Sequence, residues 1–226
     1  MQFAVFVFEF EQAAAARYDP EPEFRDLLSK SPAINRLSAA RLFLFAARDV
    51  WFVVALPVYL STMLGWSYWQ VGGFLATWII GYGAVQSLAP TITGLRAGRV
   101  PDGRSAFGWA VALSALPAAI ALAIANGGSP TAALIIGLLA FGVLFAVNSA
   151  VHSFLIVSHA QEDGVSLDVG FYYMANAMGR LLGTLLSGYV YQASGLMACL
   201  WISSGLVLLA ALVSSGLPTH ETSPTH

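Results

Sequence analysis

The chain has 226 residues, of which 58% are hydrophobic and only 10% are charged, and its formal net charge is −2. A soluble domain has about 25% charged residues, so a soluble core cannot hide this much apolar sequence and the bilayer must be its solvent. The near-neutral charge argues against a nucleic-acid partner, and the single cysteine, Cys199, excludes an internal disulfide.

Residues 1–36 are predicted to form an N-terminal segment and a cytoplasmic linker. The opening run MQFAVFVFEF is too short to span a bilayer, which needs about 20 residues, and it lacks the positive flank of a signal peptide. We interpret it as an interfacial segment or, alternatively, as the scar of a truncation. The stretch EFRDLLSKSPAINR predicts a short helix along the membrane surface that breaks before Pro32.

The rest of the chain predicts an all-α, polytopic membrane protein with a bundle of six transmembrane helices over residues 37–217. Long runs without charge are divided by polar and glycine-containing turns, and Pro57 is predicted to kink the first helix near its far end. The predicted spans cover residues 37–63, 68–94, 105–125, 131–157, 169–191 and 196–217, and residues 218–226 form a cytoplasmic tail.

The distribution of Lys and Arg predicts the orientation of these spans. The N-terminal linker carries four basic residues and the loop at 94–104 carries Arg96, Arg99 and Arg104, whereas the loops after the first, third and fifth helices carry none. The positive-inside rule therefore places both termini in the cytoplasm and the protein in the inner (plasma) membrane.

Charged residues inside the first helix provide the main evidence for function. A charge near the bilayer centre costs at least about 2.5–3.5 kcal/mol, so such residues usually face a partner or a cavity. Arg41 and Arg48 are seven residues apart and share one helical face. We predict that Arg41 snorkels to the cytoplasmic surface. Arg48 and Asp49 lie about 100° apart around the helix, so we expect no good pair between them.

Polar side chains in three other helices repeat a spacing of four residues, which places each pair on one helical face. The hypothesis is a shared polar cavity lined by the first, second, fourth and fifth helices. Its candidate substrate-binding residues are Arg48, Asp49, Tyr82, Gln86, Asn148, His152, Tyr172, Asn176 and Arg180.

Two intramembrane guanidinium groups favour an anionic substrate with phosphate or carboxylate oxygens, and Asp49 is then a partner or a protonatable switch. The structural alternative is that Asp49 pairs with Arg48 or Arg180. For the amides of Gln86, Asn148 and Asn176 both interpretations stay open. We interpret His152 as a satisfied hydrogen-bonder between helices.

Glycines in two helices predict close helix packing: Gly179 and Gly183 in the fifth span, and Gly72, Gly73, Gly81 and Gly83 in the second. The sequence shows no metal-ligand spacing, no cofactor motif and no nucleophile–base pair. We therefore expect no metal, no cofactor and no enzyme activity, which disfavours a membrane enzyme built on His152 and Asp49.

Six spans, cytoplasmic termini and a basic loop after the second span resemble one half of a major facilitator transporter. The stretches FRDLLSKSPAINRLSAARLFLFAARDVWFVVALPVYL, WQVGGFLATWIIGYGAVQSLAP and GFYYMANAMGRLLGTLLSGYVYQ resemble the C-terminal half of the organoarsenical efflux permeases of arsenic-resistance operons. The resemblance implies export of 1-arseno-3-phosphoglycerate, which a partner glyceraldehyde-3-phosphate dehydrogenase makes, and hence arsenate resistance.

The resemblance also implies a missing part, because members of that family have twelve helices. We therefore expect a second six-helix half, either a separate chain or a second copy, since an isolated half would turn cavity-facing polar groups toward lipid. The alternative is a truncated, non-transporting remnant or an assembly partner.

Overall fold

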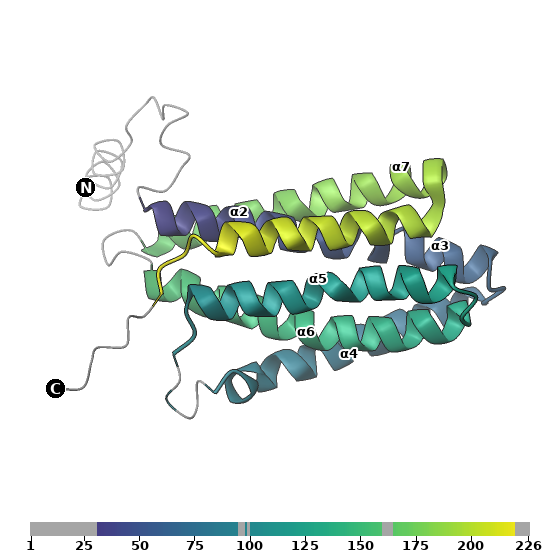
Figure 1. Cartoon of the computed structure of the whole chain (residues 1–226), viewed down its shortest axis with the longest axis horizontal. Helices are drawn as coiled ribbons and strands as arrows, with labels where there is room; N and C mark the ends of the chain where they lie inside the picture. The colour runs from purple at the N-terminus through teal and green to yellow at the C-terminus, as the bar shows by residue number, and fades with distance from the viewer. Residues whose placement is uncertain (1–30, 95–97, 99, 160–164, 220–226) are drawn as a thin grey trace, which may run out of the picture.

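The computed structural model describes residues 31–94, 98, 100–159 and 165–219, and these residues form helices and short connections. The helices run alongside one another as an elongated bundle (Figure 1). The prediction of an all-α fold is therefore confirmed, whereas the predictions for residues 1–30 lie outside the described residues. The helices are α2 (Pro32–Phe52), α3 (Ala55–Thr62), α4 (Tyr68–Ile92), α5 (Gly103–Ala125), α6 (Pro130–His159) and α7 (Val165–Ser214).

The first span begins earlier than the predicted residue 37, because Ser31 caps α2 and Pro32 occupies its first turn. The sequence predicted that a surface helix would end before Pro32. In the structure, Pro32 is the first residue of the spanning helix. α2 and α3 together form one unit of membrane length, Pro32–Thr62. The interruption at residues 53–54 lies four residues before Pro57, whose ring cannot donate to the Val53 carbonyl. The predicted kink is confirmed, and it falls one turn before the proline.

Five helices within the described ranges are long and apolar enough to cross a membrane, so six separate spans are not confirmed. The difference lies in α7, which has 50 residues and as one straight helix would be about 75 Å long, against about 30 Å of hydrocarbon. Gly195, with φ 75° and ψ −176°, interrupts it in a conformation that favours glycine. The chain reverses there (Figure 1). Residues 165–194 form the first arm of α7 and residues 196–214 form the second arm.

The two arms of α7 enclose α2. A Cβ atom on Gly179 would lie 2.3 Å from the Leu42 carbonyl oxygen, and one on Gly183 would lie 2.7 Å from the Ala46 carbonyl oxygen. The first arm therefore needs glycine at both positions, and the predicted close packing in this span is confirmed. On the other side, the Ser203 hydroxyl of the second arm donates to the Ala47 carbonyl oxygen at 2.7 Å.

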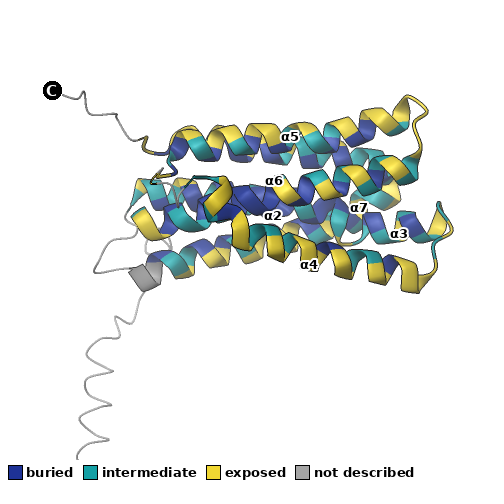
Figure 2. Cartoon of the chain, turned by 90° about the horizontal axis from the view of Figure 1, so that it is seen from below, coloured by how far each residue is buried: buried dark blue, intermediate teal, exposed yellow. Residues whose placement is uncertain are grey.

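The helix α4 is much less covered than α2. Its buried residues are Val71, Trp78 and Ala89, and most of its remaining surface is exposed (Figure 2). A Cβ atom on any of its four glycines between residues 72 and 83 would meet nothing within 4 Å. The predicted close packing of these glycines is therefore wrong within the described part of the chain, because no other helix comes close enough to contact a Cβ at any of them. Trp78 anchors α4 instead, by donating from Nε1 to the Leu138 carbonyl oxygen of α6 at 2.8 Å.

Candidate functional site

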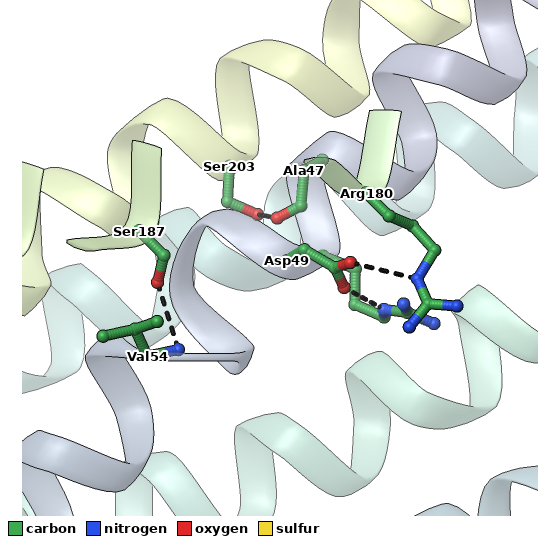
Figure 3. Close-up of polar contacts among 7 residues, drawn as sticks. Ala47, Asp49, Val54, Arg180, Ser187 and Ser203 are labelled. Atoms are coloured by element: carbon green, nitrogen blue, oxygen red, sulfur yellow. Dashed lines mark hydrogen bonds and ion pairs between the residues drawn. The ribbon is translucent and has the colours of Figure 1, made fainter. Parts of the chain in front are cut away.

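The buried carboxylate of Asp49 lies between two arginines. Arg48 donates from Nε to Asp49 Oδ1 at 2.6 Å, and Arg180 Nε of α7 forms an ion pair with Asp49 Oδ2 at 3.4 Å (Figure 3). The expectation that Arg48 and Asp49 form no good pair is wrong, because the long arginine side chain folds back across the 100° between them. The structural alternative paired Asp49 with Arg48 or Arg180, and both contacts are present.

Close contact between α2 and α7 fixes the position of Asp49. A Cβ atom on Gly183 would lie 2.9 Å from the Asp49 Cβ, so only glycine lets the first arm pass over the carboxylate. The side chain of Asp49 is 1% exposed, that of Arg48 is 14% exposed and that of Arg180 is 59% exposed. Two guanidinium charges thus share one buried carboxylate, and the more accessible one belongs to Arg180.

Arg41 and Arg48 point to the same side of α2, as their spacing predicts. The guanidinium carbons lie 4.2 Å and 4.9 Å from the centroid of the Phe45 ring, which is the geometry of two cation–π contacts. Arg48 also lies over the Phe145 ring of α6, at 5.4 Å. The predicted positive face is therefore real, and it is directed toward α6.

The prediction that Arg41 snorkels to the cytoplasmic surface is wrong. The residue is 5% exposed, and its Nη1 donates to the carbonyl oxygen of Ser149 at 3.1 Å and to the hydroxyl oxygen of Ser149 at 2.9 Å. The face of the helix that carries Arg41 packs against α6, so the side chain is held sideways within the bundle. The position of Arg41 in the first half of α2 did not decide the direction of its side chain.

Asn148 and His152 are buried beside this arginine on α6. Neither amide atom of Asn148 and neither ring nitrogen of His152 has a hydrogen-bond partner among the described residues. The interpretation of His152 as a satisfied hydrogen-bonder is thus wrong. For Asn148, the alternative in which its amide ties helices together finds no supporting contact in the described part of the chain.

Tyr172 and Asn176 lie on the first arm of α7. Tyr172 is fully buried, and the Arg41 guanidinium carbon lies 5.0 Å from the centroid of its ring. The Oδ1 atom of Asn176 is buried without a hydrogen bond within the described residues. The first arm of α7 therefore contacts α2 at two places along its length. Tyr172 lies beside Arg41, and Arg180 lies beside Asp49.

Tyr82 and Gln86 of α4 lie at the edge of this arrangement. Tyr82 stacks on Trp78 with a centroid distance of 5.6 Å, and its ring lies 5.9 Å from Phe145, the aromatic residue beneath Arg48. Trp78 and Tyr82 also line a largely apolar cavity of about 270 Å³ between α4 and α6. Gln86 is half-buried one turn beyond Tyr82 and does not line this cavity.

Comparison with known proteins assigns the chain to a family. The model of the Major Facilitator Superfamily matches residues 16–225, which is nearly the whole chain. The chain belongs to the major facilitator superfamily. The quinolone resistance protein NorB of Staphylococcus aureus (strain bovine RF122 / ET3-1) is 30% identical to it over 87 residues. These residues are 35% of this chain and 19% of NorB, so the chain matches only about a fifth of that relative's length.

The superfamily consists of transporters, and together with the apolar helices it makes the chain a multi-pass membrane protein. In this major facilitator chain, the cluster of Arg48, Asp49 and Arg180 carries a net positive charge and is suited to hold an anion. Among the described residues, no group of three His, Cys, Asp or Glu side chains is placed to hold a metal ion.

Three serines of this major facilitator protein form hydrogen bonds between helices, and the sequence analysis did not single them out. Ser149 holds Arg41, and Ser203 joins the second arm of α7 to α2. Ser187 accepts from the amides of Val54 and Ala55 at 3.3 Å and 3.0 Å, which are the groups left free at the interruption between α2 and α3 (Figure 3). The only sequence signal for Ser149 is its position beside Asn148.

Proposed function

We propose that the chain is one six-helix half of a major facilitator efflux transporter for an organic oxyanion, in which the two arms of α7 are separate spans. The observation that carries the proposal is the buried carboxylate of Asp49 shared between Arg48 and Arg180. One carboxylate neutralises one of the two guanidinium groups, so the centre keeps a net positive charge inside the spanning region. An anion is the ligand that balances it.

Arg180 is the residue that meets the substrate first in this proposal. Its side chain is 59% exposed, and its ion pair with Asp49 is longer than the 2.6 Å contact of Arg48. A partly exposed ion pair of this kind contributes about 1 kcal/mol or less, so substrate oxygens displace it at small cost. The planar guanidinium then binds a phosphate or carboxylate through two hydrogen bonds.

The proposed substrate is 1-arseno-3-phosphoglycerate, with arsenate resistance as the result. The resemblance of the chain to organoarsenical efflux permeases supports this choice, and the positive centre agrees with a multiply charged anion. A glyceraldehyde-3-phosphate dehydrogenase is the proposed functional partner that makes the substrate. Both termini are proposed to lie in the cytoplasm, since the basic residues flank the same ends of the helices.

A second six-helix half is part of the same proposal, as a separate chain or a second copy. The exposed face of α4, with its four glycines open, and the exposed guanidinium of Arg180 are the surfaces that such a half would cover. Substrate would then bind between the halves. As proposed, transport requires both halves, and this chain alone is not sufficient.

Arsenate resistance of the native host tests this proposal, because chromosomal variants keep any partner half in place. Arg48→Gln and Arg180→Gln are expected to lose resistance while the amount of protein in the membrane stays unchanged. Arg104→Gln is the matched control, because Arg104 is an exposed arginine at the start of α5. Unchanged resistance in both site variants would contradict the proposal and would favour a non-transporting remnant.

The aromatic cavity favours a second candidate substrate, an aromatic organic anion. The Trp78–Tyr82 stack lines the cavity, and Tyr82 contacts Phe145 directly beneath the Arg48 guanidinium. A flat ring with a carboxylate would place the ring in the cavity and the charge at Arg48. Tyr82→Ala, which removes the stack and keeps the Trp78 hydrogen bond to α6, is expected to reduce export of such a compound, for example a quinolone. It is expected to leave arsenate resistance unchanged if the smaller anion is the substrate.

A further inference from the structure

A second positive centre lies toward the predicted cytoplasmic end of α2, away from Asp49. It consists of Arg41 with the side chains of Ser38, Asn148, Ser149 and His152, which we call the Arg41 cluster. All five residues are buried. Three of them come from α6, so the cluster is formed where α2 and α6 pack together.

The charge of Arg41 has no carboxylate partner in the described ranges. The ion pairs recorded there join Asp49 to Arg48 and to Arg180, and Arg41 takes part in neither. The groups that contact it directly are neutral, namely the Ser149 carbonyl and hydroxyl oxygens and the faces of Phe45 and Tyr172, and the other charge near it is the like charge of Arg48 across the Phe45 ring. A buried charge without a counter-charge is costly, and an anionic ligand would supply the opposite charge.

The polar groups beside Arg41 are also unsatisfied. The Arg41 Nε, both amide atoms of Asn148, both ring nitrogens of His152 and the Ser38 hydroxyl oxygen are buried without a hydrogen-bond partner in the described residues. More than nine in ten buried polar groups normally have a partner, so several orphans around one guanidinium require an explanation. Most of these groups are able to donate, which is the property that an oxyanion needs.

We propose that the Arg41 cluster is an inner binding site for an oxyanion of the transported substrate. This inference rests on the proposed function and adds a second anion site to it. Arg41 Nε, the Asn148 amide and a His152 ring N–H donate to the anion, while Ser149 keeps the guanidinium in position through Nη1. The site holds a phosphate or carboxylate group by charge and hydrogen bonds together.

The Arg41 cluster lies close to the cluster of Arg48, Asp49 and Arg180, and this proximity suggests the class of substrate. The guanidinium groups of Arg41 and Arg48 both lie within 5 Å of the centroid of the Phe45 ring. In this proposal a short organic chain with an oxyanion at each end binds with one end at Arg48 and Arg180 and the other at Arg41. A monoanion occupies one site at a time. The proposal therefore predicts tighter binding of doubly anionic substrates than of singly charged ones.

Titration with inorganic phosphate tests the inner site. The protein is purified with any partner half in nanodiscs of phosphatidylcholine, and its unfolding temperature is followed by tryptophan fluorescence as phosphate is added. A ligand that binds the folded state raises this temperature with concentration. We expect the Arg48→Gln/Asp49→Asn/Arg180→Gln variant, which lacks the outer site and leaves no buried carboxylate unpaired, to keep a phosphate-dependent rise.

Adding Arg41→Gln to that variant is expected to raise the apparent phosphate Kd about tenfold or more, the effect of losing charge-assisted hydrogen bonds. Should the Arg41 variant fail to fold, His152→Leu in the same background replaces it and is expected to raise Kd several-fold. A background variant without any phosphate response would overturn the inner site. So would a response that is unchanged after Arg41→Gln or, where that variant fails to fold, after His152→Leu.

A control experiment distinguishes substrate from lipid as the source of the oxyanion. If phosphatidylglycerol nanodiscs without phosphate gave the same Arg41-dependent rise, a lipid headgroup would be the occupant and the substrate site would be overturned. Failure of the proposed function gives a different pattern: wild-type protein that exports no anion but keeps the Arg41-dependent phosphate response. The two outcomes are therefore distinguishable.

Discussion

The helices α2 and α4 meet the rest of the protein in opposite ways. α2 lies between the two arms of α7, with glycines at the contact and a buried carboxylate beneath them. α4 packs against α6 through Trp78 and exposes most of its length, including four glycines at which a Cβ atom would meet nothing within 4 Å. The same residue type therefore marks close packing in one helix and an open face in the other. The charged site lies on the closely packed side, and the open face is the surface proposed for a second half.

Asp49→Asn removes the carboxylate between α2 and α7 and has the largest expected effect on the free energy of unfolding. The substitution leaves Arg48 and Arg180 without a counter-charge, and breaking a buried ion pair costs roughly 3–5 kcal/mol, at the lower end here because both arginines are partly exposed. The free energy of unfolding in detergent measures it. The double variant Arg48→Gln/Asp49→Asn should recover part of the loss. A single variant as stable as wild type would contradict the account.

Gly183→Ala tests whether the contact between α2 and the first arm of α7 requires glycine. The new methyl group would lie 2.7 Å from the Ala46 carbonyl oxygen, so the arms must separate from α2 at a cost of about 1–3 kcal/mol. Gly83→Ala in α4 is the matched control, because it meets nothing and gains up to about 1 kcal/mol of helix propensity. The two unfolding free energies should move in opposite directions. Equal shifts would refute the contrast between packed and open faces.

Trp78→Phe gives the smallest expected effect and tests how α4 is attached. It removes the hydrogen bond from Nε1 to the Leu138 carbonyl oxygen and keeps most of the ring, so the expected loss is about 1 kcal/mol. Trp69→Phe serves as its control, since Trp69 of the same helix is 92% exposed. Both variants are compared by unfolding in detergent. An equal effect at the two positions would show that Trp78 does not anchor the helix.

Much of the fold followed from apolar runs and their turns. The polar breaks predicted most helix ends, and Pro57 predicted the kink because a missing amide acts on the residue four positions earlier. The sequence did not predict that α7 would stay helical up to Gly195, since Gln192 and Ser194 look like turn residues. One glycine with positive φ is enough to reverse the chain, and its neighbours remain helical.

Side-chain directions in the site were harder to predict than helix faces. The spacing of Arg41 and Arg48 placed both on one face, but not the partner that each one meets. Arg41 turns inward because α6 offers it the Ser149 oxygens, and such a contact depends on how two helices pack. Arg48 reaches Asp49 because its side chain is flexible, whereas the angle between adjacent residues is a property of the backbone.

Export of anion by membrane vesicles tests the central claim most directly. Everted vesicles from the native host receive purified dehydrogenase, its triose phosphate substrate, labelled arsenate and NAD+ as the hydride acceptor, and the initial rate of arsenic accumulation is measured. Arg180→Gln is expected to reduce this rate by about tenfold or more, as the loss of a charge-assisted contact predicts. Arg180→Lys should keep part of the rate and Arg104→Gln all of it. A wild-type rate in Arg180→Gln vesicles would contradict the anion site.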